Sequence, residues 1–114
     1  MNGMFLFCTA ETIILSSFNT ENVVDMENMF FDCWVECLDL SNFNTSKVVN
    51  MKGMFSLCKI RSLDLKSFDT SNVTSMEDMF FECQIDFLNL STFNTSNVNN
   101  MRGMFSRCKV PTCV

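Results

Sequence analysis

The 114-residue sequence contains no histidine. Histidine is the usual proton carrier near neutral pH and a common metal ligand, so histidine-dependent catalysis and histidine metal sites are excluded. No run of about 18 apolar residues occurs, and we therefore expect no membrane span. Only 8 lysines and arginines oppose 13 aspartates and glutamates, a net charge of −5. A nucleic-acid-binding protein would present a basic face, so we expect no nucleic-acid partner.

Two further patterns are missing. The chain has 7 cysteines but no C-x-x-C pair, the spacing typical of zinc sites, so we expect no metal and no cofactor. Nothing in the sequence indicates an activated nucleophile or an oxyanion hole, and we expect no catalytic residues and no enzymatic activity. The opening MNGMFLFC lacks the basic residues of a signal peptide and is interpreted as part of the repeat described next.

What the sequence does contain is one 25-residue unit repeated from end to end. The pair Met-Phe marks the period, beginning at Met4, Met29, Met54, Met79 and Met104. A period of this length is typical of a solenoid, in which each repeat forms one coil that stacks on the next. We predict a single solenoid domain over residues 1–114, with coils 1–25, 26–50, 51–75, 76–100 and a partial coil 101–114, about 4.5 coils in all.

The third repeat indicates a strand. Leu63 and Leu65 are apolar and alternate with the polar Ser62, Asp64 and Lys66. This alternation predicts a short half-buried strand. Strands one period apart must run parallel, so the coils should share a parallel sheet.

The rest of the coil predicts a turn and a helix. Asp69 and Thr70 offer side-chain oxygens to backbone N–H groups, as in a turn that leads into a helix N-cap. Apolar residues then recur at helical spacing, namely Val73, Met76, Met79, Phe80 and Cys83. The third position of every coil holds Gly, Asn or Asp, which tolerate left-handed backbone, so the helix is expected to be short or broken.

Five cysteines occupy one repeat position and should form a stacked ladder. They are Cys8, Cys33, Cys58, Cys83 and Cys108. Neighbouring coils lie about 4.8 Å apart, a separation that a disulfide tolerates. The ladder cysteines are therefore expected to be either buried thiols or disulfide pairs. Cys37 and Cys113 lie outside the ladder and are better candidates for disulfide or thiol chemistry, with Cys113 in reach of Cys108 across the local turn.

Odd and even coils differ in a regular way. The second position runs Asn2, Glu27, Lys52, Glu77, Arg102, an alternation of acid and base. Stacked like charges would repel, whereas alternation makes neighbouring contacts favourable and helps to set the register, although it also serves solubility. The alternation makes the true unit 50 residues.

The outward side of the predicted sheet is the candidate binding surface. It carries Asp39, Ser41, Ser62, Asp64, Lys66, Phe87 and Asn89. These positions are equally compatible with simple solvated strand residues. Four Asn-x-Ser/Thr sequons are possible glycosylation sites, at Asn44, Asn72, Asn89 and Asn94. Repeats rich in Asn, Thr and Ser also produce sequons by chance.

One series of residues resembles a known family. Leu38-Asp39-Leu40-Ser41, Thr45-Ser46, Val48, Met51, Met54-Phe55 and Cys58 are similar to the BspA-like leucine-rich repeat, of the lipoprotein-associated surface repeat family. The resemblance covers essentially the whole chain. It implies an α/β repeat, a right-handed leucine-rich-repeat-like solenoid with a short parallel sheet on one side and short helices or turns on the other. Two features depart from the family pattern, a coil shorter by one residue and the lack of a recognisable terminal cap.

Two functional hypotheses follow. The resemblance implies a non-catalytic cell-surface or secreted protein that mediates adhesion, binding a protein or glycan partner on its sheet face. The alternative is a structural subunit. Both ends look uncapped, and an uncapped solenoid end can stack on a copy of itself, head to tail, into an extracellular filament.

Overall fold

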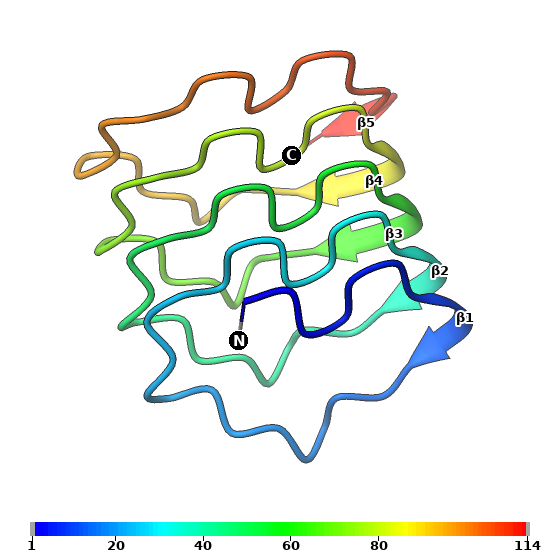
Figure 1. Cartoon of the computed structure of the whole chain (residues 1–114), viewed down its shortest axis with the longest axis horizontal. Helices are drawn as coiled ribbons and strands as arrows, with labels where there is room; N and C mark the ends of the chain where they lie inside the picture. Colours follow the sequence, from blue (N-terminus) through cyan, green and yellow to red (C-terminus); the bar gives the residue numbers. More distant parts are fainter. Residues whose placement is uncertain (1, 114) are drawn as a thin grey trace.

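The computed structural model describes residues 2–113. These residues form one parallel sheet whose strands follow chain order (Figure 1). The strands are β1 (Thr9–Ile13), β2 (Trp34–Leu38), β3 (Lys59–Asp64), β4 (Gln84–Asn89) and β5 (Thr112–Cys113). The chain leaves each strand, passes through turns on the other side, and returns to the next strand along the sheet.

The register of the sheet repeats the period of the sequence. Val35 lies beside Ile60, and Ile60 lies beside Ile85, so each residue meets its equivalent 25 positions later. The path from β1 to β4 therefore makes three turns of a parallel β-solenoid with a 25-residue spacing. The predicted solenoid, its period and its parallel sheet are confirmed.

A ladder of aromatic rings runs through the core along the stack. Consecutive rings lie 5.4 to 5.6 Å apart between centroids and within 8° of parallel. The ladder consists of Phe5, Phe30, Phe55, Phe80 and Phe105. Because one coil covers only the apolar edge of its neighbour, this core exists only where coils are stacked.

The predicted helix is wrong, and with it the α/β class, because the described residues contain no helix. The apolar spacing instead reflects consecutive turns. In the second coil the Met29 N–H donates to the Met26 carbonyl and the Cys33 N–H donates to the Phe30 carbonyl. Between them, the Phe30 N–H donates to Met54 in the next coil. Local turn bonds and inter-coil bonds therefore take the donors that a helix would use.

Two left-handed residues in each coil shape these turns. One is the third coil position, as expected, with φ of 54° at Asn28 and 61° at Gly53. The other is the seventh position, where non-glycine residues adopt this conformation, including Asp32 at 55° and Leu57 at 60°. Left-handed backbone reverses the chain direction and cannot continue a right-handed helix.

The third position also explains why odd and even coils differ. A Cβ atom added to Gly53 would fall on the side-chain oxygen of Asn28, in the coil before it. A Cβ atom added to Gly103 would fall on the side-chain oxygen of Asp78 in the same way. Each Asn or Asp in an even coil thus occupies space that only a glycine in the following odd coil leaves open.

The strands begin earlier than predicted and do not alternate strictly. Strand β3 starts at Lys59 and ends at Asp64, so Lys66 lies beyond it. Ile60 and Leu63 are buried, whereas the two residues between them are both exposed. The sheet therefore presents an additional outward position in each coil near the start of the strand, which the expected alternation did not include.

Polar ladders close the corners opposite the sheet. The buried Thr45 hydroxyl donates to the carbonyl of Asp69 at 3.0 Å and accepts from the Asp69 N–H at 2.8 Å. Thr20 and Thr70 make the same pair of bonds to Asn44 and Asn94. The turn predicted at this position is present, but it holds neighbouring coils together and does not cap a helix.

Candidate functional site

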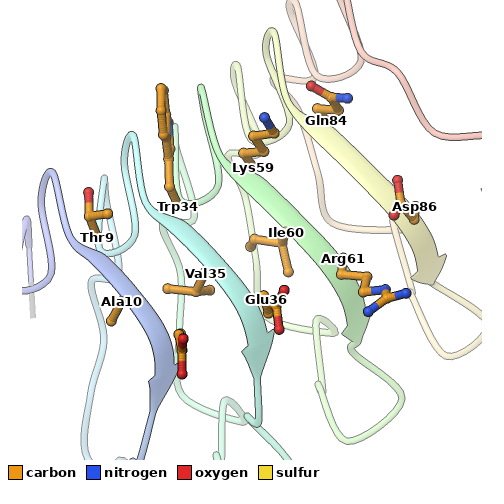
Figure 2. A pocket seen from close by; sticks show the side chains of 11 residues that line it. Thr9, Ala10, Trp34, Val35, Glu36, Lys59, Ile60, Arg61, Gln84 and Asp86 are labelled. Carbon is orange, nitrogen blue, oxygen red and sulfur yellow. The ribbon is translucent and has the colours of Figure 1, made fainter.

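A concave surface crosses the first halves of β1 to β4, on the outward side of the sheet. We call it the Trp34 groove, and its volume is about 670 Å³. Side chains from neighbouring strands stand side by side along it (Figure 2). Its principal outward side chains are Trp34, Glu36, Lys59, Arg61, Gln84 and Asp86. Thr9 and Glu11 complete it on β1.

The single tryptophan of the chain is fixed in this groove. Trp34 is 53% exposed, and its indole Nε1–H donates to a carboxylate oxygen of Asp32 at 3.1 Å. The Lys59 ammonium lies 5.7 Å from the ring centroid, a cation–π contact on one side of the ring. Figure 2 shows the indole standing between Lys59 and the small side chain of Thr9. The ring is thus held in one orientation while remaining largely exposed.

The charges of the groove are separated along the sheet. Glu11 and Glu36 come from the adjacent strands β1 and β2, whereas Lys59 and Arg61 both come from β3. Within residues 2–113, none of these four side chains forms an ion pair with another charged group. The groove is therefore acidic over β1 and β2, basic over β3 and acidic again at Asp86 on β4, with Arg61 between Glu36 and Asp86.

A second groove holds five of the residues predicted for the binding surface. It measures about 440 Å³ and is called here the Asp64 groove. The predicted residues that line it are Asp39, Ser41, Ser62, Asp64 and Lys66. Phe87 and Asn89 lie next to it on β4, beside Ser62 and Asp64 respectively. The seven predicted residues thus share one region of the sheet, and their binding role stays a prediction.

Several of these polar side chains also stabilise the backbone. The Asp39 carboxylate accepts a hydrogen bond from the Ser41 N–H at 2.9 Å, and bonds from Ser41 lower the pKa of Asp39. Asp64 accepts from the Lys66 N–H in the same way, and Lys66 lies 4.0 Å from Asp64 as an exposed ion pair. Recurrence of Asp or Asn at this position follows from turn chemistry alone.

A match to a protein-family model shows the family to which this protein belongs. The model for the family described as "Mycoplasma protein of unknown function, DUF285" matches residues 1–112. The chain belongs to this family. In this DUF285 protein the match covers the solenoid from the first coil through most of the last. No curated protein matches the chain. No solved structure matches it either.

The five cysteines predicted to form a ladder lie at equivalent places before the strands of the DUF285 solenoid. The Cys33 thiol donates to the Phe5 carbonyl and the Cys58 thiol to the Phe30 carbonyl, each at 2.8 Å. Cys83 and Cys108 differ, with their sulfurs 2.9 Å apart. Burial raises the pKa of the Cys33 thiol to about 11 and also raises that of Cys58.

The described side chains include no disulfide, and the ladder cysteines Cys8, Cys33, Cys58 and Cys83 are free thiols. Cys37 is also a free thiol and is exposed on β2, beside Ser62. The predicted approach of Cys113 to Cys108 lies outside the described side chains.

The four sequons fall in different environments. Asn44, Asn72 and Asn94 are exposed on the turn side, whereas Asn89 is half-buried in β4. The side-chain amide of Asn72, where a glycan would be attached, donates to the Ser46 carbonyl at 2.7 Å. A glycan at Asn72 would take one of the two hydrogens of this nitrogen and leave the other for the bond between coils.

Sequence reasoning missed the Trp34 groove. The strand was expected to begin later, so the residues at the ninth and eleventh coil positions were not placed on the sheet face. The sequence does mark these positions, because their residue type varies from coil to coil. The ninth position holds Thr9, Trp34, Lys59, Gln84 and Lys109, while the surrounding apolar positions barely change.

Within residues 2–113, no helix could cross a bilayer and no group of acidic or cysteine side chains is arranged to hold a metal ion.

Proposed function

We propose that this DUF285 protein is a non-catalytic interaction module, displayed on a cell surface or secreted, that binds a protein or glycan partner through its sheet face. The observation that carries the proposal is the Trp34 groove, in which a fixed and exposed aromatic ring is flanked by charged side chains of both signs. Exposed tryptophan and arginine are characteristic of binding surfaces.

The arrangement of constant and variable positions supports the same function. Phenylalanine, methionine and leucine recur at the buried positions and build a scaffold, whereas the outward positions nine, eleven and twelve of the coil change from coil to coil. Solenoids commonly bind partners through such extended surfaces. The resemblance to BspA-like leucine-rich repeats supports a surface location, and a right-handed solenoid of about 4.5 coils is part of this proposal.

Substitution of a central residue of the sheet face tests the proposal. Ser62 is exposed and lies in the Asp64 groove, so Ser62→Arg would obstruct a bound partner. Ser96→Arg is the matched control, because Ser96 is exposed at a corner away from the sheet. Labelled wild-type protein and both variants would be applied to arrays of purified extracellular proteins and of glycans.

We expect saturable binding to array members that Ser62→Arg abolishes and Ser96→Arg retains. Binding that both variants lose equally would show that the sheet face is not the interaction surface, and binding that survives Ser62→Arg would exclude the Asp64 groove. Protein and glycan spots on the same arrays separate the two classes of partner.

End-to-end assembly is the alternative function, and the exposed end of the aromatic ladder favours it. Phe105 is 47% exposed, although its equivalents Phe30, Phe55 and Phe80 are fully buried. Met4 and Phe7 are exposed at the opposite end. A second copy stacked on either end would cover such side chains and continue the ladder.

Electron microscopy of a dilution series, with and without reductant, tests this alternative. Rods of uniform width that lengthen with concentration, and that Phe105→Asp shortens, would support assembly. Particles of constant size at every concentration would eliminate it.

A further inference from the structure

We propose that the Trp34 groove binds an extended segment of a partner protein that carries an arginine and, two residues away, an acidic side chain. This inference rests on the proposed function and specifies the chemistry of the partner. It depends on three features of the groove, which are the free face of the indole, the acidic half over β1 and β2, and the position of Arg61.

The indole offers one face for a planar cation. Lys59 lies over one side of the Trp34 ring, and the short side chain of Thr9 stands on the other side (Figure 2). A guanidinium group stacks on an indole more readily than an ammonium group does, because it is planar and weakly hydrated. The bond from the indole nitrogen to Asp32 holds the ring in place before any partner arrives.

The acidic half of the groove complements the same cation. Ala10 pairs with Val35 and Thr12 with Cys37, which places Glu11 directly beside Glu36 on the neighbouring strand. Two like charges on strands about 4.8 Å apart repel each other. A partner cation between them would relieve that repulsion, and an arginine offers enough N–H donors for both carboxylates.

The basic residues of the groove determine where the partner segment should carry its acidic side chain. Arg61 lies on β3, so its strand is about 7 Å from the line midway between β1 and β2. Residues two apart in an extended chain are also separated by about 7 Å. A segment crossing the strands with its arginine at Trp34 would thus bring a carboxylate to Arg61. A neutral sugar could stack on the indole, but it would not relieve the repulsion between Glu11 and Glu36.

Peptide binding tests the proposal directly. The probes are labelled peptides with the cores Gly-Arg-Gly-Glu-Gly, with the proposed spacing, and Gly-Arg-Glu-Gly-Gly, with the same composition and adjacent charges. Maltotriose is the sugar probe. Fluorescence anisotropy measures peptide affinity, and the emission of Trp34, the only tryptophan, reports occupancy of the groove itself.

We expect the first peptide to bind saturably, to change the Trp34 emission, and to bind about twofold to fivefold more tightly than the second, the range expected for exposed charge pairs. The double variant Glu11→Gln/Glu36→Gln should weaken binding by a similar factor. Glu21→Gln is the control, because Glu21 is exposed outside the groove. Added salt should weaken binding to the wild type more than binding to the double variant.

Three outcomes would overturn the proposal. They are an equal affinity for both peptides, an affinity unchanged in the double variant, and a saturable emission change with maltotriose but not with peptide. If the peptides fail while array binding is still lost in Ser62→Arg, this inference is wrong and the interaction function stands. If the peptides fail and Ser62→Arg also has no effect on any array binding, the proposed function fails as well.

Discussion

The interior and end coils of this solenoid have nearly the same sequence and very different surroundings. Met26, Met51 and Met76 are fully buried, whereas Met101, at the same coil position, is 46% exposed. The sequence of a coil therefore does not determine how much of its apolar surface is removed from water. That depends on the neighbouring coils, so equivalent substitutions should have effects that depend on position along the stack.

The aromatic ladder should show the largest difference between the two regions. Phe55 is fully buried between Phe30 and Phe80, and Phe55→Ala should lower the free energy of unfolding by about 3 to 5 kcal/mol. Phe105→Ala should cost only about 1 kcal/mol, because its ring is already half exposed. Urea denaturation followed by circular dichroism measures both. If Phe55→Ala does not fold, Phe55→Leu keeps the comparison possible, and equal costs at the two sites would contradict it.

Substitutions at the third coil position should give the next largest effect. Gly53→Ala places a methyl group against Asn28 at a φ of 61°, which should cost about 2 to 3 kcal/mol. Adding Asn28→Gly should restore part of that loss by removing the obstructing amide. Gly3→Ala has the same φ but meets only the flexible end of Leu6, so it should cost about 1 to 2 kcal/mol. A double variant no more stable than Gly53→Ala would refute the steric explanation.

The threonine ladder provides a smaller contrast. Thr45→Val removes both hydrogen bonds to Asp69 and leaves its backbone groups without a partner, which should cost about 1 to 3 kcal/mol. Thr95→Val should be nearly neutral, because Thr95 is exposed. Thermal melting of the two variants side by side measures the difference. Similar melting temperatures would mean that these bonds contribute little to the stacking of coils.

The cysteines should give the smallest effect, visible only at alkaline pH. Because burial raises the pKa of Cys33 from 9.0 to about 11, the folded state retains a proton that the unfolded chain releases. The resulting stability is complete below about pH 9 and is lost as the pH rises through 11. Urea midpoints between pH 8 and 11 should therefore fall less steeply for Cys33→Ala than for the wild type. A parallel decline in both would exclude this thiol as the cause.

Much of the scaffold could be predicted because its signals are repeated. The solenoid, the parallel sheet and the left-handed third position follow from residues that recur every 25 positions. The helix was wrong for a physical reason, since apolar spacing of three and four residues also suits consecutive turns. The left-handed backbone at the seventh coil position could not be predicted, because Asp32 and Leu57 adopt it although neither is glycine.

The candidate site was predicted only in part. Asp39, Asp64 and Lys66 were placed on the sheet face because the alternation of Leu63 and Leu65 indicated an outward side. Trp34 was not, because two consecutive exposed residues in β1, β2 and β3 break that alternation and shift the outward positions. A pattern that assumes strict alternation cannot locate such a break.

The contact between Asn28 and Gly53 has a consequence for how such chains change length. Loss of residues 51–75 would set Asn28 against Asp78, which has the side chain that Gly53 lacks. Loss of residues 51–100 would set Asn28 against Gly103 and preserve the fit. Repeats in this family should therefore be gained and lost in pairs, and an inherited array with a single coil removed would carry a compensating glycine at the new junction.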